Sequence, residues 1–335
     1  MHKKFEKNRA VALINKALAA IVLVASGAAH AQTGAAAYPT KPVKLVVGFA
    51  AGGPTDVVAR AFADHASKAL GQPFIIDNKP GAGTIIAAQA VASAPADGYT
   101  LLFGATNHTM IPGLYQNRVK FDAVKSFRPL CTVASSPTVL VVAPGLPVKT
   151  LADYLAKARA EPGRVTAGTA GVGSSGHFAT EVFARTQGLQ LNHVPYKGAA
   201  PVVTDLMGGQ LDSSFATLGS VLPQIKSGKL RALAVGAPHR SAVAPDLPTF
   251  AEAGGGNYAA DVWYGVLAPA GLPEPVAHAL EQAAAEFAKS AAAAEKLSGL
   301  GMTPESQCGA PFATRVAREV ATHSQIAKAL DLKAD

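Results

Sequence analysis

Two short glycine-rich segments, residues 52–56 and 173–177, contain the residues best suited to hold a ligand. Each follows an apolar run of strand length and precedes an amphipathic run of helical length, so each is expected to open a helix at the carboxyl edge of a sheet. The first N–H groups of a helix have no partner within it and lie at the positive end of its dipole. Either segment alone is also compatible with an ordinary βα turn. One in each half of the chain favours a shared site that holds an anion without a charged side chain.

Catalytic motifs near these segments are incomplete. Residues 171–176 have the glycine spacing of a dinucleotide fingerprint, but residues 192–195 lack the acidic residue that would hold a ribose. Ser174 and Ser175 do not occupy a nucleophile elbow, and His177, in a predicted first helical turn, is more typical of a capping or contact residue than of a general base. No spacing of cysteine, histidine or acidic residues matches a metal site. We therefore predict no catalytic residue, no metal and no cofactor.

Other polar residues near the two segments have more than one interpretation. Asp56 either complements the dipole of the first predicted helix or orients a group of the ligand. Thr106 and Asn107 follow a predicted strand and are placed to donate to a ligand, although an ordinary polar turn has the same composition. Lys197 is the most suitable cation for a carboxylate, but a solvated loop lysine is the simpler interpretation. Trp263 is expected in the core.

The elements that would position these residues alternate between short apolar runs and amphipathic runs, a pattern typical of βαβ units around a parallel sheet. The first set contains strands at 43–49, 74–76 and 99–103, and helices at 54–70 and from 84 onward. The second set contains a helix from 150 that opens with a capping-box pattern, strands at 165–168, 191–195, 211–215 and 230–235, and helices through 181–183, 201–207 and 220–227. An apolar run at 262–267 and a helical stretch from 274 complete the chain.

This order of elements predicts two lobes joined by two crossing strands. The first lobe would comprise residues 38–138 and 261–335, and the second residues 139–260. Two crossings, near 138–142 and 258–262, would form a hinge. The cleft between two such lobes is a common ligand site.

The first 31 residues have the pattern of a secretory signal peptide. Basic residues within positions 3–9 precede an apolar stretch at 11–25, and residues 29–31 form a small-x-small cleavage site. The apolar stretch from 17 to 29 is shorter than the roughly 20 residues that span a bilayer, which disfavours a retained anchor. We therefore expect cleavage near Ala31 and export to the periplasm.

Charge and cysteine content narrow the classes of partner. The formal net charge is +8 at pH 7, but the lysines and arginines are scattered singly, so no nucleic acid partner is expected. A mild positive field would attract an anionic solute. Cys131 and Cys308 are the two cysteines, and the periplasm would allow them to pair. The interpretation preferred from sequence is nevertheless two buried thiols that behave as small hydrophobes.

Ordered blocks of the sequence resemble the periplasmic receptors of tripartite tricarboxylate transporters, the Bug or TctC-like proteins. Similar blocks lie at 38–48, 52–56, 78–83, 97–102, 193–198, 228–235 and 267–271. The resemblance implies a type II periplasmic-binding-protein fold, in which two α/β lobes are joined by a two-strand hinge with the ligand cleft between them. It also implies a receptor that captures a small carboxylate and delivers it to membrane permease subunits, with no enzymatic activity. We expect it to act as a monomer.

In that family the two glycine-rich segments grip a carboxylate, largely through backbone groups and ordered waters. The resemblance transfers this role to the residues of the two segments, and neighbouring positions complete the predicted site. The predicted ligand-binding residues are Phe49, Ala50, Gly53, Thr55, Asp56, Thr106, Asn107, Thr169, Ser174, Ser175, His177 and Phe215.

Departures from the family pattern bear on the ligand. Ala51 and Pro54 stand where the family usually has proline and a small residue, and Pro54 removes one backbone donor. Residues 84–86 replace a more polar stretch of the family and residues 216–217 a more polar pair, so the cleft is expected to be more apolar. We predict a mono- or dicarboxylate with an apolar or aromatic part in preference to citrate. A periplasmic ligand sensor that feeds a two-component signalling kinase would use the same clamp and is the alternative, whereas an exported hydrolase is disfavoured.

Overall fold

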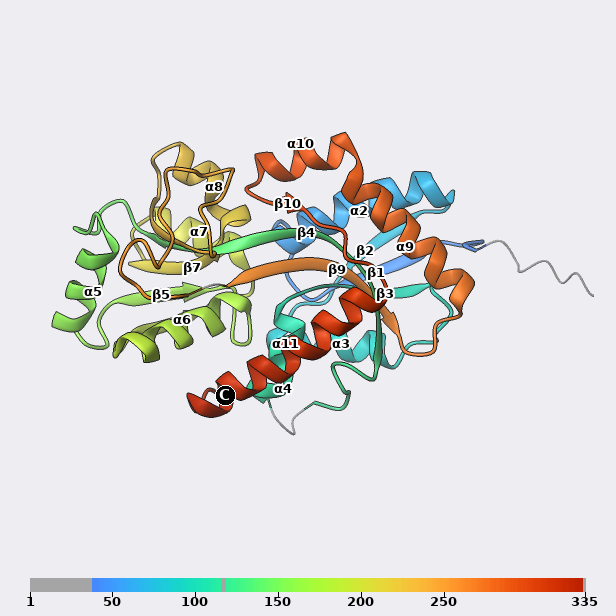
Figure 1. Ribbon diagram of the computed structural model, residues 1–335, viewed down its shortest axis with the longest axis horizontal. Coiled ribbons are helices and arrows are strands. Elements are labelled where there is room, and N and C mark those ends of the chain that lie inside the picture. The colour runs from blue at the N-terminus through green and yellow to red at the C-terminus, as the bar shows by residue number, and fades with distance from the viewer. Residues whose placement is uncertain (1–37, 116–118, 259, 334–335) are drawn as a thin grey trace, which may run out of the picture. The chain divides into compact units, whose positions relative to one another are not determined.

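The computed structural model describes residues 38–115, 119–258 and 260–333 (Figure 1). The predicted signal peptide, residues 1–31, lies outside these residues. The elements below all belong to the unit formed by Lys41–Asp335. Within the described residues, no helix combines the length and the hydropathy that a membrane crossing requires.

A sheet of ten strands runs through the described residues in the order β2-β1-β3-β9-β4-β7-β5-β6, and β8 and β10 are further partners of β4. The strands are β1 (Val43–Val47), β2 (Phe74–Asn78), β3 (Thr100–Ala105), β4 (Phe127–Val142), β5 (Thr166–Thr169), β6 (Asn192–Pro195), β7 (Ser213–Thr217), β8 (Arg231–Gly236), β9 (Asp261–Pro269) and β10 (Thr303–Pro304).

The sheet is mixed, whereas the sequence pattern predicted a parallel one. Strand β1 pairs in parallel with β2 and β3, and β5 pairs in parallel with β6 and β7. Strand β9 is antiparallel to β3 and β4, and β4 is also antiparallel to β7 and β8. A strand buried on both faces reads as an apolar run in either orientation, which is why the sequence did not distinguish them.

Strand β4 links the two parallel groups. Its first part pairs with β9, from Phe127 opposite Pro269 to Pro137 opposite Asp261, and its last five residues pair with β7 and β8. Figure 1 shows β4 and β9 running side by side through the middle of the fold. The sequence prediction included only residues 139–142 of this strand. Two prolines and two register shifts interrupt the first part, and prolines within a run argue against a strand.

Helices cover the sheet on both faces. They are α2 (Pro54–Leu70), α3 (Ile85–Ala92), α4 (Asn107–Tyr115), α5 (Leu151–Ala160), α6 (Ser175–Gln187), α7 (Ala199–Met207), α8 (Leu218–Lys226), α9 (Glu274–Lys289), α10 (Ala291–Gly299) and α11 (Ala310–Ala329). Alternate residues of a strand point to opposite faces. Accordingly, Leu140 and Val142 pack in the core formed with α5 and α6, whereas Val139 and Val141 pack in the core formed with α7 and α8.

Helix α2 follows the sequence signals closely. Pro54 is its first residue, where a missing N–H breaks no helical hydrogen bond. Gly71 ends it in the left-handed region at φ 71°, and its N–H donates to Ser67 O. Phe62 lies on the buried face and contacts the rings of Phe74 and Phe103. The buried face fixes the direction of the helix, and with it the position of the loop that precedes it.

The C-terminal helices return to the first parallel group. Helix α11 packs against α4, a helix that the sequence pattern did not predict (Figure 1). Trp263 of β9 is fully buried, as predicted, with its ring 5.0 Å from that of Phe312 and its Nε1 donating to Glu319 at 2.8 Å. The chain therefore ends by covering the strand that crosses between the two groups.

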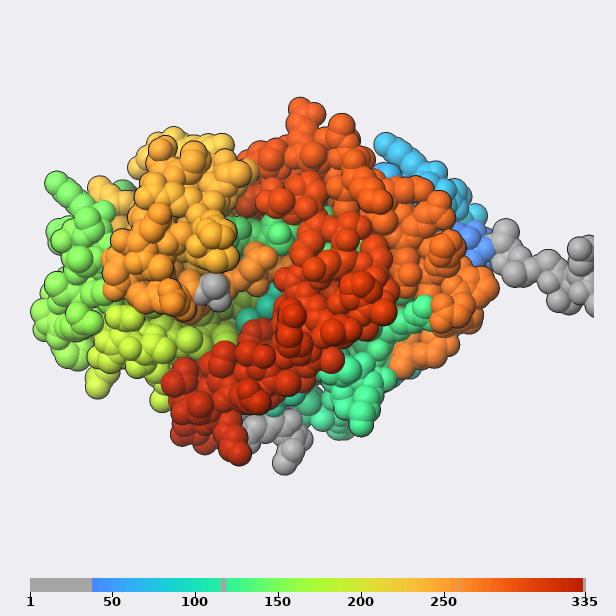
Figure 2. Space-filling view, viewed as in Figure 1, coloured from blue at the N-terminus to red at the C-terminus, as the bar shows by residue number. Residues whose placement is uncertain are grey.

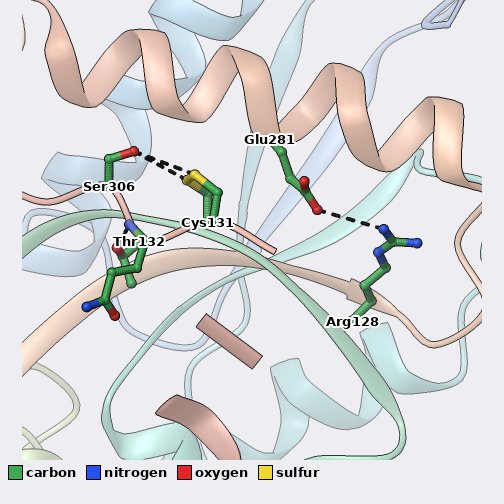
Figure 3. Close-up of a disulfide and its surroundings, with 7 residues drawn as sticks. Arg128, Cys131, Thr132, Glu281 and Ser306 are labelled. Atoms are coloured by element: carbon green, nitrogen blue, oxygen red, sulfur yellow. Dashed lines mark hydrogen bonds and ion pairs between the residues drawn. A yellow bond between two sulfur atoms is a disulfide. The ribbon is translucent and has the colours of Figure 1, made fainter. Parts of the chain in front are cut away.

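Cys131 and Cys308 form a disulfide, so the preference for two free thiols was wrong. Figure 3 shows the bridge between β4 and the segment that carries Ser306. Two hydrogen bonds align the segments: Thr132 N donates to Gln307 O, and Gln307 N donates to the side-chain oxygen Thr132 Oγ1. This alignment joins residues 177 positions apart, a proximity that spacing alone does not reveal. The disulfide ties the C-terminal segment to the crossing strand β4.

Candidate functional site

The two glycine-rich segments lie on one cavity. Its volume is about 70 Å³, and its wall contains residues of both predicted loops and of the crossing strand β9. The lining residues are Phe49, Gly53, Pro54, Thr55, Ala105, Asn107, Ala170, Ser174, Ser175, Gly176, Ala199, Val202, Val203, Leu206, Ser214, Phe215, Ala216, Thr217, Ser220, Val221, Val262 and Tyr264. In the space-filling view, a furrow separates the region before β9 from α11 on this face of the molecule (Figure 2).

The first loop is held in place by Asp56. The Asp56 carboxylate accepts hydrogen bonds from Gly52 N (2.9 Å), from Arg60 Nε and Nη2 (2.9 and 3.0 Å), and from Asn78 Nδ2 (2.9 Å). Asn78 Nδ2 also donates to Phe49 O at 3.0 Å. Burial alone would raise the pKa of Asp56, but the hydrogen bonds from Arg60, Gly52 and Asn78 outweigh it and lower the pKa. The carboxylate is thus occupied by protein donors and fixes both sides of the loop.

The first turn of α2 presents backbone donors to the cavity. Gly53 is the N-cap residue and provides no side-chain cap. Pro54 has no N–H, so Thr55 supplies the first N–H of the helix that has no intrahelical acceptor. Gly52, at φ 83°, adopts the left-handed conformation that turns the chain into the helix. An anion at this end would meet free donors and the positive end of the dipole.

The second loop has the same architecture at the start of α6. Ser174 is the N-cap, and its Oγ accepts from His177 N at 3.2 Å. The N–H groups of Ser175 and Gly176, in the first turn, have no intrahelical acceptor. A side chain at position 176 would place its Cβ 2.4 Å from Phe215 O, so only glycine lets this turn approach the end of β7 so closely. The close approach brings the helix N-terminus to the cavity wall.

His177 stabilises this loop without lining the cavity. Its Nδ1 accepts from Gly173 N at 3.3 Å, and its ring lies 4.5 Å from that of His193. His193 Nε2 is 2.7 Å from Thr169 Oγ1. Burial, with a smaller contribution from His193, lowers the pKa of His177 to about 4. The imidazole is therefore neutral at pH 7 and contributes no positive charge to the site.

Seven of the twelve predicted ligand-binding residues line the cavity and five do not. Those in the wall are Phe49, Gly53, Thr55, Asn107, Ser174, Ser175 and Phe215, and those outside it are Ala50, Asp56, Thr106, Thr169 and His177. Thr106 Oγ1 accepts from Trp263 N at 2.8 Å, and so ties β3 to β9. Asn107 Nδ2 donates to Thr84 Oγ1 at 2.6 Å, which holds Thr84 at φ 79°.

Lys197 lies outside this cavity. It borders an adjoining hollow of about 500 Å³ that shares Phe49, Ala170 and Ser174 with the cavity. Among the described residues that line the cavity itself, none is a lysine, arginine or histidine. In the described residues, no group of three or more histidine, cysteine, aspartate or glutamate side chains is arranged to hold a metal.

Sequence reasoning missed the apolar wall of the cavity and one of its hydroxyls. Helices α7 and α8 and strand β9 supply Val202, Val203, Leu206, Val221 and Val262. These residues have the pattern of ordinary core positions, and no local signal separates a core from a cavity lining. Tyr264 was also missed. Neighbouring residues of a strand point to opposite faces of the sheet, so a core position for Trp263 already indicated that Tyr264 faces the other side.

Comparisons with known proteins agree with this architecture. The family model "Tripartite tricarboxylate transporter family receptor" matches residues 58–332. Protein BugT of Bordetella pertussis is 35% identical over 284 residues, which cover 84% of this chain and 87% of BugT. Among solved structures, Rpa4515 of R. palustris with adipate has a TM-score of 0.84 and 35% identity, covering 88% of this chain and 99% of that one.

A second solved structure, MatC of Rhodopseudomonas palustris with bound malate, has a TM-score of 0.81 and 30% identity, covering 86% of this chain and 99% of that one. These matches confirm the predicted periplasmic-binding-protein fold of mixed α/β type and the predicted family. This chain belongs to the tripartite tricarboxylate transporter receptors, a family of periplasmic solute-binding proteins and not of enzymes.

Proposed function

We propose that this receptor captures a small mono- or dicarboxylate with an apolar or aromatic part and delivers it to the membrane permease subunits of a tripartite transporter. It would act as a monomer in the periplasm after its signal peptide, residues 1–31, is removed near Ala31. The observation that carries the proposal is the meeting of two helix N-termini, those of α2 and α6, on one otherwise apolar cavity.

The donors fit a carboxylate. A buried anion is destabilised unless it is hydrogen-bonded. The N–H groups of Thr55, Ser175 and Gly176 supply donors, and each helix end adds a favourable contribution of about 0.3–1 kcal/mol, up to ~2 kcal/mol when partly buried. This arrangement needs no arginine. Hydroxyl groups of Ser174 and Ser175, or ordered water, complete the coordination.

The rest of the wall fits an apolar skeleton. Apart from a few hydroxyls and Asn107, the lining of the cavity is aliphatic or aromatic. Burial of apolar surface contributes about 25 cal/mol per Å². Citrate carries three carboxylates, and the described part of the cavity wall offers no cation to compensate the second and third. Adipate and malate, the ligands of two related receptors, are dicarboxylates and support a carboxylate ligand here.

Residues outside the wall would act through the loops. We assign direct contact to the seven predicted residues that line the cavity and positioning to the other five. Asp56 holds the first loop, His177 and Thr169 hold the second, and Thr106 ties the strand ends together. Ala50 adjoins Phe49 in the first loop.

Closure of two lobes around the ligand completes the proposal. The lobes would comprise residues 38–138 with 261–335, and residues 139–260, with β4 and β9 as the hinge. Contacts join these parts near the cavity, where Tyr115 Oη donates to Val172 O at 3.0 Å and the rings of Phe178 and His323 lie 5.2 Å apart. Opening of the cleft would break both contacts.

A proline substitution tests the backbone donors. Ser175→Pro removes the first N–H of α6, and Ser174, at φ −71° and ψ 160°, already has the extended conformation that must precede proline. We expect calorimetry with adipate and benzoate to show binding to the wild type, and about ten- to 150-fold weaker binding to Ser175→Pro, the scale of a lost hydrogen bond to a charged group.

A matched control is available in α10. Ala291 also occupies the first helical position, after Ser290 at φ −74° and ψ 141°, and lies on the surface away from the cavity. Ala291→Pro should leave affinity unchanged, and Ser175→Ala separates the hydroxyl from the N–H. Tight binding of citrate with no binding of benzoate or short dicarboxylates would refute the proposed ligand class. Full affinity in Ser175→Pro would refute the proposed donors.

A further inference from the structure

A buried tyrosine hydroxyl in the cavity wall makes no hydrogen bond to the described part of the protein. Tyr264 lies on β9, lines the cavity and is 1% exposed. Its Oη has no partner in hydrogen-bonding geometry among the described residues. The neighbouring Thr217 hydroxyl lowers the pKa of Tyr264, as a hydrogen-bonding group would, but no contact between the two oxygens satisfies both the distance and the direction of a hydrogen bond. Thr217 Oγ1 donates to Ser220 Oγ at 3.4 Å.

An unpaired buried hydroxyl is unusual because it lowers stability by about 1–3 kcal/mol. Phenylalanine would fill the same volume at this position without that loss. Tyr264 is held in the sheet, opposite Ala105 of β3 and Ala134 of β4, so its ring has little freedom to find another partner. The position of the hydroxyl in a ligand cavity supplies a reason for its presence, since a bound molecule can pair with it.

The charges around Tyr264 restrict which chemical group of a bound molecule can lie beside its hydroxyl. Burial, with a smaller effect from Asp261, raises the pKa of Tyr264, so the phenol keeps its proton and acts as a donor. Arg315 is 4.0 Å from Asp261, but it is also paired with Glu305 and Glu319 at 2.6 and 2.8 Å. These charged groups pack on the face of β9 that carries Trp263, opposite the face of Tyr264 and the cavity, and Asp261 is the one that adds to the raised pKa of Tyr264. A second carboxylate beside Tyr264 would find no cation among the described residues of the cavity wall.

We propose that Tyr264 is a specificity-determining residue that donates a hydrogen bond to an uncharged oxygen, such as a hydroxyl or ketone, on the apolar part of the carboxylate ligand. The inference rests on the proposed function, because it takes the binding of a carboxylate by α2 and α6 as given. It names the ligand class more narrowly, as a hydroxy or oxo acid.

Three probes with the same six-carbon chain test it. Hexanoate, 6-hydroxyhexanoate and adipate differ only at the sixth carbon, which is a methyl, a hydroxymethyl or a carboxylate group. Calorimetry should show that the wild type binds 6-hydroxyhexanoate about three- to tenfold more tightly than either of the others, the scale of one neutral hydrogen bond. Tyr264→Phe should reduce the affinity for 6-hydroxyhexanoate to that for hexanoate.

Tyr154→Phe is the matched control. Its hydroxyl is also fully buried but lies 3.0 Å from Ser213 Oγ and outside the cavity. The control should keep the wild-type preference among the three acids. In urea unfolding without ligand, Tyr154→Phe should lose stability because a buried hydrogen bond to Ser213 Oγ is removed, whereas Tyr264→Phe should be at least as stable as the wild type.

The outcomes separate this inference from the proposed function. If the preference for 6-hydroxyhexanoate survives in Tyr264→Phe, or if adipate is preferred, the role of Tyr264 is refuted and the carboxylate receptor stands. Loss of stability in Tyr264→Phe as large as that in Tyr154→Phe would show that the hydroxyl has a protein partner and would also refute it. If the wild type binds none of the three acids, both proposals fail.

Discussion

Replacing Asp56 by alanine should weaken ligand binding although this carboxylate does not line the cavity. One oxygen of the carboxylate accepts from Gly52 N and the other from Asn78 Nδ2, and Arg60 donates to both oxygens. Removal of the two carboxylate oxygens frees the turn that precedes α2 and leaves the Gly52 N–H without its acceptor. The donors of the α2 N-terminus would then have to be ordered when the ligand binds.

The expected loss of binding free energy depends on how exposed each hydrogen-bond partner of Asp56 is. The Arg60 side chain is 51% exposed, so water can replace most of that ion pair, which leaves a contribution of at most about 1 kcal/mol. The bonds from Gly52 and Asn78 are made to a carboxylate that is 3% exposed, and bonds to charged groups contribute about 1.5–3 kcal/mol each in mutational series. Because part of that loss affects only folding, we expect affinity to fall by about 1–3 kcal/mol, or about five- to 150-fold.

Arg60→Ala is the control, since it removes the exposed pair and keeps both buried bonds. Calorimetry with a carboxylate that binds the wild type should rank affinities as wild type, then Arg60→Ala close behind, then Asp56→Ala. The lowered pKa of Asp56 contributes stability above its unfolded value of about 3.9, and this contribution is lost as pH falls through the folded pKa. The stability difference between Asp56→Ala and the wild type should therefore shrink below about pH 4. Equal damage in the two variants, or full affinity in Asp56→Ala, would refute the reasoning.

Three further predictions concern the second loop and the disulfide. Gly176→Ala should weaken binding and destabilise the protein by about 1–3 kcal/mol, because the added Cβ would meet Phe215 O at 2.4 Å. Gly145→Ala, where an added Cβ has nothing within 4 Å, should change neither affinity nor stability. Equal calorimetric results for the two variants would contradict this prediction. The double substitution Cys131→Ser with Cys308→Ser should lower the free energy of unfolding in urea by about 2–5 kcal/mol, and unchanged stability would argue against the bridge. With a folded pKa of about 4, His177 makes the protein less stable as pH falls from about 6.5 towards 4, since the unfolded chain binds the proton first. His177→Asn should reduce the dependence of the free energy of unfolding on pH in this range by up to about 1.4 kcal/mol per pH unit. An unchanged pH dependence would contradict this prediction.

The sequence by itself predicted the elements that carry local signals. Pro54 and Gly71 mark the two ends of α2, and the capping box of Thr150 and Asp153 marks the start of α5, as the structure confirms. Such signals involve residues within a few positions of each other, so they can be recognised from the sequence alone. The ordered family blocks and the two glycine-rich segments likewise placed a helix N-terminus in each half of the chain.

Only the tertiary structure decided which distant residues meet. It paired Cys131 with Cys308, made β4 and β9 antiparallel, and showed that the Asp56 carboxylate is occupied by loop donors. It also turned apolar residues of α7 and α8 into a cavity wall and left Tyr264 in that wall with an unpaired hydroxyl. An apolar side chain has the same sequence pattern in a core and in a cavity, and pairing across the chain depends on register. The sequence therefore determined the donors of the site, and the fold determined what they face.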